Sequence, residues 1–185
     1  MKYSINNFFS PEECLEFLDF MDKNGERFSY KKDEKISWDC KRVYDPDFKS
    51  TILQKINSLY DSQKINFWFN YKDFKITNIN ISLTKYYEGR YLDLHRDSTS
   101  SFTTVIPITE NYHDGRFVLS EKYRKIESDE NTFLNLKMGQ GVTFKGDKTY
   151  HGVMQVNKGI RCAMNIWMND KNFEYYKIDL NKKLI

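Results

Sequence analysis

A histidine and a carboxylate stand two positions apart at the end of the stretch YYEGRYLDLHRD, as His95 and Asp97. Successive side chains of a β-strand alternate between its two faces, so this spacing places the imidazole and the carboxylate side by side. Together they supply two of the three protein ligands of a 2-His-1-carboxylate site, which holds Fe(II) and leaves other coordination positions open. A short motif of this kind also occurs by chance as a surface pair, so the hypothesis requires a second histidine.

The second histidine is His113 or His151, since the chain has three histidines in all. His113 lies in the polar stretch NYHDG, which is predicted to be a turn, and an exposed histidine there needs no function. His151 lies in the predicted strand TYHGVMQV, directly before Gly152, a residue that lets another group approach closely. We therefore predict His151 as the distal ligand.

Arg161 is the basic residue that could complete the site. If residues 157–159 form a three-residue hairpin loop, Gln155 pairs with Arg161. Arg161 would then point to the same face as His151, displaced by roughly 13 Å along the sheet. A cation so placed can take the far carboxylate of a ligand that chelates the metal at its other end. A two-residue loop would shift this register, and the alternative is an arginine on an exposed ribbon.

Two helices precede the part of the chain that carries these residues. The first has Ser10 as its N-cap, Pro11 at its first position, Glu13 to complete a capping box and Gly25 to end it. The second begins at residues 45–47, Asp-Pro-Asp. Both helices carry an apolar stripe that is expected to face the core: Leu15, Leu18 and Met21 on the first, and Ile52, Ile56 and Leu59 on the second.

From residue 64 onward the chain changes to short runs of Phe, Tyr, Ile and Thr broken by Asn, Gly and Asp, which is typical of an all-β region. Pro107 in the predicted strand SFTTVIPIT indicates a bulge or an edge. A further short strand is expected in ISWDCKRVY. We predict a single α+β domain over residues 1–185, with 1–63 mainly helical and 64–170 forming a β-sandwich or jelly-roll core.

Composition excludes several classes of protein. The net charge of +3 is small and the lysine pairs are separated, so no nucleic-acid partner is expected. Three widely spaced cysteines without a CxxC motif (Cys14, Cys40 and Cys162) argue against a disulfide framework and against a zinc knuckle. The N-terminus lacks the pattern of a signal peptide, and no run of ~18 apolar residues suggests a membrane span. These features predict a soluble, cytoplasmic protein.

The order of these motifs resembles that of the iron(II)- and 2-oxoglutarate-dependent dioxygenases, in which an HxD motif is followed by a distal histidine and then by a basic residue. Tyr86 and Gly89 before the HxD resemble the prolyl 4-hydroxylase branch, as do the segments NNFFSPEECLEFL, DGRFVLSE and GQGVTFKGDKTYHGVMQVNKGIR. The resemblance covers nearly the whole chain and implies a double-stranded β-helix with N-terminal helices packed on it. Two departures concern the co-substrate pocket: Ala163 stands where the family often has serine, and Pro107 where relatives often have tyrosine.

The resemblance implies that His95, Asp97 and His151 bind Fe(II). It further implies that 2-oxoglutarate chelates the iron, that Arg161 pairs with its 5-carboxylate and that Tyr86 forms a hydrogen bond nearby. O2 would be the other co-substrate, with support from ascorbate, and succinate and CO2 would be released as a C–H bond is hydroxylated. A carboxylate at Asp97 favours hydroxylation, because a small residue there would leave room for a halide.

The pattern favours a prolyl or other peptidyl side chain as substrate, with a free amino acid or small metabolite as the next choice. Nucleic-acid dealkylation is disfavoured because RCAMNIWMND lacks the second arginine expected in that branch. A cupin-like module that holds a metal without oxidising anything is an alternative of a different class, because a fold does not determine a function.

Overall fold

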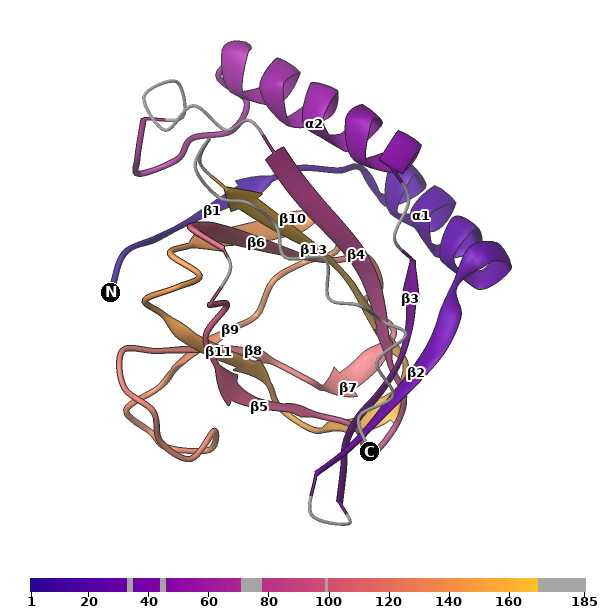
Figure 1. Cartoon of the computed structure of the whole chain (residues 1–185), viewed down its shortest axis with the longest axis vertical. Helices are drawn as coiled ribbons and strands as arrows, with labels where there is room; N and C mark the ends of the chain where they lie inside the picture. The colour runs from indigo at the N-terminus through magenta and orange to yellow at the C-terminus, as the bar shows by residue number, and fades with distance from the viewer. Residues whose placement is uncertain (33–34, 44–45, 71–77, 99, 170–185) are drawn as a thin grey trace.

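The computed structural model describes residues 1–32, 35–43, 46–70, 78–98 and 100–169, and it describes the side chains in these ranges except those of residues 26–48 and 78. This part of the chain contains two helices, a seven-stranded sheet, a four-stranded sheet and a two-stranded ribbon. Figure 1 shows both helices on the outer side of the larger sheet, while the smaller sheet faces its other side. The predicted α+β class is confirmed.

The strands of the two sheets interleave along the chain. The larger sheet has the order β1 (Tyr3–Asn7), β10 (Gln140–Phe144), β6 (Phe102–Pro107), β13 (Arg161–Asn169), β4 (Asn78–Tyr86), β3 (Lys35–Val43), β2 (Glu26–Lys32). The smaller sheet has the order β5 (Leu92–His95), β11 (Tyr150–Val153), β8 (Phe117–Ser120), β9 (Thr132–Leu134), and the ribbon pairs β7 (Tyr112–Asp114) with β12 (Val156–Gly159). Because β4, β5 and β6 alternate between the sheets, as do β10, β11 and β13, the predicted jelly-roll core is confirmed.

The helices begin where their capping residues predict. In α1 (Pro11–Asn24), Ser10 accepts from the Glu13 N–H while the Glu13 carboxylate accepts from the Ser10 N–H, which is the predicted capping box. The other helix, α2 (Pro46–Asp61), starts at the proline, and its Ile52 and Ile56 are buried as predicted. These helices cover one face of the larger sheet.

The predicted burial of one residue in the apolar stripe of α1 is wrong. Leu15 is 57% exposed, whereas its neighbour Cys14 is fully buried together with Met21. Cys14 and Met21 are separated by two helical turns, so they share a face, and Leu15 lies outside it. The sheet surface beneath α1 therefore decides which side of the helix is buried.

The larger sheet separates two apolar clusters because alternate side chains point to opposite faces. On β4 and β13, one set packs beneath the helices: Ile79, Ile81, Leu83, Met164, Ile166 and Met168. Side chains of the other face fill the space between the two sheets, together with residues of the smaller sheet: Tyr86, Val105, Ala163, Phe144, Phe117 and Leu119. The interior between the sheets is where the candidate site lies.

The predicted hairpin between His151 and Arg161 is wrong. The strand β12 that includes residues 157–159 pairs with β7, so these residues form no tight turn. His151 lies on β11 of the smaller sheet, whereas Arg161 lies on β13 of the larger sheet and pairs with Tyr86. The chain crosses between sheets here, so the two side chains do not share a sheet face. The stretch predicted as a turn at 111–115 is likewise partly a strand, β7.

Pro107 lies neither at an edge nor at a bulge. It is the last residue of β6, an inner strand whose register with β13 is regular. A proline is tolerated there because the strand ends with it, and its carbonyl accepts a hydrogen bond from Gly139. The strand predicted in ISWDCKRVY is confirmed as β3, and the first 63 residues thus contribute three strands as well as two helices.

The predicted absence of membrane spans and disulfides can be compared with the described residues. No helix in this part of the chain is long and apolar enough to cross a membrane. Cys14 and Cys162 are buried free thiols, and burial raises their pKa values to about 11 and about 12 respectively. The side chain of Cys40 lies outside the described residues.

Two glycines with positive φ allow a matched test of this fold. Gly139 (φ +77°) accepts hydrogen bonds from Phe8 and Phe9, and a Cβ on it would lie 2.1 Å from the Phe9 carbonyl oxygen. Gly89 (φ +79°) has no atom within 4 Å of the corresponding position. We expect Gly139→Ala to lower the free energy of unfolding by about 2 kcal/mol more than Gly89→Ala, because only the former adds a backbone clash. Urea denaturation measures both, and equal losses would contradict this packing.

Candidate metal centre

The three predicted ligands lie together between the two sheets. His95 at the end of β5 and His151 on β11 are cross-strand partners in the smaller sheet, and their ring centroids are 4.3 Å apart. Asp97 follows β5 and lies 3.8 Å from Nε2 of His95 and 3.4 Å from Nε2 of His151. One ligand atom from each residue lies within 4.8 Å of the others. Two imidazoles and a carboxylate at these distances can bind one divalent metal ion.

Both imidazoles are oriented by the backbone. Nδ1 of His95 lies 3.0 Å from the carbonyl oxygen of Asp93, and Nδ1 of His151 lies 3.2 Å from that of Thr149. A carbonyl oxygen only accepts hydrogen bonds, so Nδ1 carries the proton in each ring and Nε2 keeps its lone pair. Both lone pairs are thereby available at the centre of the cluster, as metal-binding histidines require.

Asp97 is held by donors from the larger sheet. Its Oδ2 accepts from the Thr103 hydroxyl at 2.6 Å on β6 and from the Trp167 indole at 3.0 Å on β13. Its backbone N–H donates to Gly146 at 3.0 Å. With Oδ2 engaged by two donors, Oδ1 is left to bind a metal through a single oxygen.

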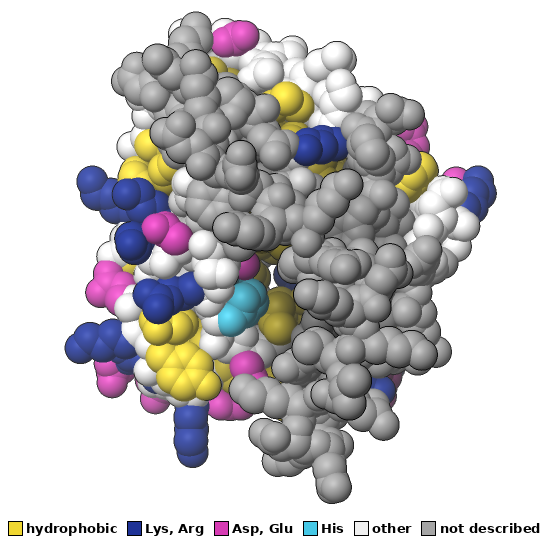
Figure 2. All heavy atoms as spheres, in the orientation of Figure 1, with side chains coloured by type: hydrophobic (Ala, Val, Ile, Leu, Met, Phe, Trp, Pro, Cys, Tyr) yellow, Lys and Arg dark blue, Asp and Glu magenta, His cyan; other side chains and the backbone are white. Residues whose placement is uncertain are grey.

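The surroundings of His151 favour the neutral form. Burial lowers its pKa to about 4, although the nearby Asp97 charge opposes this shift. Phe144 and Phe117 pack around the ring, with centroids 4.8 and 6.0 Å away. A neutral imidazole is the form that binds metals, and the apolar rings limit the access of water. The centre is open on one side, since the His95 side chain is 38% exposed, and Figure 2 shows a histidine at a hollow in this face of the molecule.

Arg161 is a buried cation without a carboxylate beside it in the described part of the chain. It is 1% exposed, its guanidinium carbon lies 5.6 Å from the centroid of the Tyr86 ring, and its Nε has no hydrogen-bond partner there. Burying a charge costs free energy unless a partner compensates it. The arrangement therefore indicates an anionic ligand.

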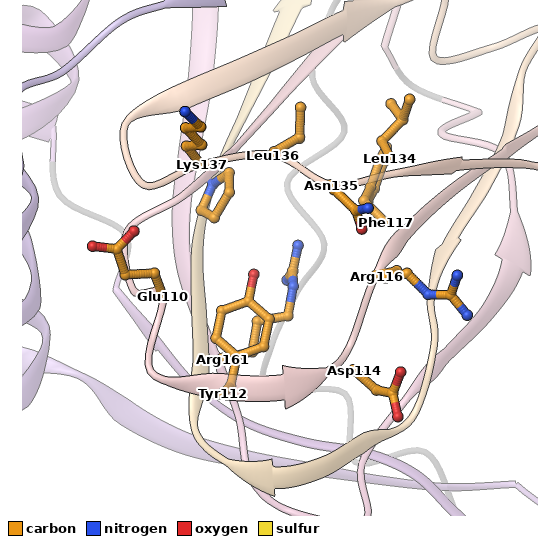
Figure 3. Close-up of a pocket in the computed structure, with 11 residues that line it drawn as sticks. Glu110, Tyr112, Asp114, Arg116, Phe117, Leu134, Asn135, Leu136, Lys137 and Arg161 are labelled. Carbon is orange, nitrogen blue, oxygen red and sulfur yellow. The ribbon is translucent and has the colours of Figure 1, made fainter.

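A cavity of about 480 Å³ opens beside Arg161. Figure 3 shows its lining, to which β7, β8 and the segment after β9 contribute most of the side chains. The residues are Pro107, Glu110, Tyr112, Asp114, Arg116, Phe117, Leu134, Asn135, Leu136, Lys137 and Arg161. Phe117 lines this cavity and its ring centroid lies 6.0 Å from that of His151, so the cavity and the metal ligands share this neighbour.

His113 lies away from the centre, as expected for an exposed residue. Its side chain on β7 is 76% exposed and its Nδ1 lies 3.3 Å from Asp114. Sequence reasoning missed Thr103 and Trp167, which orient Asp97. Trp167 lies an even number of residues from Arg161 on one strand, which indicates a shared face, but nothing in the sequence shows that this face meets Asp97.

Comparison with protein families gives one match to this region. The family model described as 2OG-Fe(II) oxygenase superfamily matches residues 81–169, the segment that contains the three candidate ligands and Arg161. A search of curated proteins finds no match.

Several solved structures share the fold at low sequence identity. A prolyl-4-hydroxylase of Pseudomonas putida has a TM-score of 0.63 and 10% identity, over 91% of this chain and 92% of that chain. A viral collagen prolyl hydroxylase of Paramecium Bursaria Chlorella virus-1, in a 2OG complex, has a TM-score of 0.57 and 16% identity, over 92% and 96%. A prolyl hydroxylase of Trichoplax adhaerens, in complex with a hypoxia inducible factor peptide fragment, has a TM-score of 0.64 and 15% identity, over 91% and 83%. These likenesses confirm the double-stranded β-helix.

The hydrogen bond from Trp167 to Asp97 predicts a measurable effect on metal binding. Trp167→Phe removes the indole donor that orients the carboxylate, and we expect the affinity for Fe(II) to fall roughly tenfold or more. Anaerobic titration against a competing chelator measures this affinity. Trp68→Phe is the matched control, because the Trp68 indole N–H has no partner among the described residues. An equal affinity in all three proteins would show that Trp167 does not orient a metal ligand.

Proposed function

Because the chain belongs to the 2OG-Fe(II) oxygenase superfamily, whose enzymes use Fe(II) and 2-oxoglutarate, we propose that His95, Asp97 and His151 hold the iron in this protein. The observation that carries the proposal is the convergence of two Nε2 lone pairs and one carboxylate within 4.8 Å. These are the donors of a 2-His-1-carboxylate site. When bound, Fe(II) with 2-oxoglutarate and O2 supplies the oxidising power that converts C–H to C–OH, with release of succinate and CO2.

The protein contributes orientation and the exclusion of water. Thr103 and Trp167 fix the carboxylate of Asp97, so one of its oxygens would hold the iron and leave no room there for a halide. This supports hydroxylation as the reaction. Phe117 and Phe144 keep the inner side of the centre apolar, while the exposed side at His95 leaves an approach for the substrate.

Arg161 is proposed to bind the far carboxylate of 2-oxoglutarate. Its guanidinium carbon lies 5.6 Å from the ring centroid of Tyr86, its cross-strand neighbour, and its Nε has no partner among the described residues. The N–H edge of a guanidinium can form a bidentate pair with a carboxylate. Tyr86 is itself 4% exposed and lines the interior between the sheets, which supports the role of a nearby hydrogen-bonding group. Burial makes the pair stronger than it would be in water.

The proposed substrate is a prolyl or other peptidyl side chain. The Tyr86 and Gly89 pattern before the HxD supports it, and so do the similar structures, since one is of a collagen prolyl hydroxylase and another holds a peptide fragment. A free amino acid or small metabolite is the alternative, and no nucleic-acid partner is expected. Ascorbate would serve to maintain the reduced iron. The superfamily consists of oxygenases, so a metal-binding module without activity is no longer favoured.

Turnover tests the reaction. Protein purified anaerobically and loaded with Fe(II) is supplied with 2-oxoglutarate and O2, and succinate is measured with proline-containing peptides and, separately, with free amino acids. We expect peptide to increase succinate formation and to gain one oxygen atom by mass spectrometry. Stimulation by free amino acids alone would favour the alternative substrate. A wild-type protein that neither binds 2-oxoglutarate nor forms succinate would contradict the proposed function.

Two cavity arginines allow a test of the co-substrate site. Arg161→Ala removes the buried cation, and we expect the Kd for 2-oxoglutarate to rise by roughly 100-fold, the effect of losing a charge-assisted pair, while Fe(II) still binds. Arg116→Ala is the matched control, because the Arg116 guanidinium lies over the Phe133 ring, 4.9 Å from its centroid. Calorimetric titration under anaerobic conditions measures both. Similar Kd values for the two variants would count against the role of Arg161.

A further inference from the structure

A carboxylate held by Arg161 needs more than one donor. Its two oxygens offer about four acceptor positions, and the edge of one guanidinium satisfies two of them. The ring of Tyr86, the cross-strand partner of Arg161 on β4, has its centroid 5.6 Å from the guanidinium carbon. On the other side of β13, toward β6, the positions beside Arg161 supply no hydroxyl. Ala163 is the next inward-facing residue of β13 and is fully buried, and its cross-strand partner is Pro107. Neither side chain can donate a hydrogen bond, so on this side of Arg161 a further donor has to come from outside the sheet.

The ribbon of β7 and β12 brings Tyr112 to this place. A Cβ on Gly115 would lie 3.2 Å from Cδ of Arg161 and 3.5 Å from Cδ2 of Tyr112, so the stem of the arginine and the tyrosine ring both border Gly115. Figure 3 shows both side chains in the cavity, with the Tyr112 hydroxyl beside the guanidinium in this view. Tyr112 thus brings a hydroxyl into the cavity that Arg161 also lines.

The position of Tyr112 is fixed by the backbone of the ribbon. Gly159 is its cross-strand partner, and a Cβ there would lie 3.2 Å from Cα of Tyr112 and 2.5 Å from the carbonyl oxygen of Asn111. Gly115 and Gly159 both have positive φ, at +65° and +84°, which glycine adopts without strain. The two glycines allow β12 and the turn after β7 to pack closely around the tyrosine.

The other two cations that line the cavity are directed elsewhere. The Arg116 guanidinium lies over the Phe133 ring, and in Figure 3 it and the Lys137 amine point away from the guanidinium of Arg161. Two carboxylates also line the cavity, Glu110 and Asp114, and they would repel an anion that lay near them. The combination of a cation and a hydroxyl is therefore confined to Arg161 and Tyr112 among the residues that line the cavity.

We propose that Tyr112 binds the far carboxylate of 2-oxoglutarate together with Arg161, by donating its hydroxyl proton to the oxygen that Arg161 leaves free. The proposal rests on the proposed role of Arg161. It assigns to the ribbon a part in recognising the co-substrate: a 2-oxo acid without a far carboxylate makes no use of Tyr112, so this residue contributes to selectivity for a dicarboxylate.

Tyr112→Phe tests the proposal because it removes the hydroxyl and keeps the ring. With Mn(II) in place of iron, the Kd for 2-oxoglutarate is expected to rise roughly tenfold, as for the loss of a hydrogen bond to a charged group. The Kd for 2-oxopentanoate, a monocarboxylate of the same chain length, is expected to stay within about twofold of wild type, and so is the affinity for Mn(II). Tyr123→Phe is the control, since Tyr123 is 68% exposed and lies outside the cavity.

The two ligands separate a binding role from a packing role. An unchanged Kd for 2-oxoglutarate in Tyr112→Phe would overturn the proposal, and so would equal weakening of both 2-oxo acids. If 2-oxoglutarate binding depends on Arg161 but not on Tyr112, only the present proposal fails. If the wild-type protein does not bind 2-oxoglutarate at all, the proposed function fails with it.

Discussion

The hydrogen bonds that Oδ2 of Asp97 accepts from Thr103 and Trp167 are the interaction on which the centre depends. The two histidines are already paired in the smaller sheet, whereas the carboxylate lies in the connection after β5 and has no strand of its own. Donors on β6 and β13 of the larger sheet hold it in place. A Cβ on Gly146 would lie 2.4 Å from the Thr103 hydroxyl oxygen, so the glycine leaves the room that this contact requires. The ligand set is thus completed only when the two sheets face each other.

The two facing sheets also explain why the proposed anion site at Arg161 lies apart from the metal ligands. Arg161 and Trp167 belong to one strand, β13, and alternate positions on it face the interior. Trp167 reaches the metal ligand, and Arg161 lies at the other end of the strand, beside Tyr86 and the ribbon. A molecule that chelates a metal at one end and carries an anionic group at the other is the kind of ligand proposed to contact both places. One strand therefore supports both ends of the proposed co-substrate.

Local sequence patterns predicted the local features of this structure well. Ser10, Pro11 and Glu13 predicted the start of α1 because helix capping depends only on residues that are neighbours in the sequence. The HxD spacing predicted that His95 and Asp97 are adjacent because the alternation of side chains along a strand also depends only on sequence neighbours. The prediction of a hairpin before Arg161 was wrong. The sequence Asn-Lys-Gly is typical of a turn, but β12 pairs with β7, which is distant in the sequence. The burial of Leu15 was wrongly predicted, and the roles of Thr103 and Trp167 were missed, for the same reason. Their surroundings depend on pairing and packing between distant segments, which a local pattern does not encode.

The central claim is that one Fe(II) and one 2-oxoglutarate bind together at His95, Asp97 and His151. Anaerobic titration of the iron-loaded wild-type protein with 2-oxoglutarate, followed by the visible charge-transfer absorption that arises when a 2-oxo acid chelates Fe(II), measures this directly. The predicted result is an absorption that saturates at one 2-oxoglutarate per iron and one iron per chain, and that is lost in His151→Ala. Absence of the absorption in the wild type, or its persistence in His151→Ala, would contradict the account.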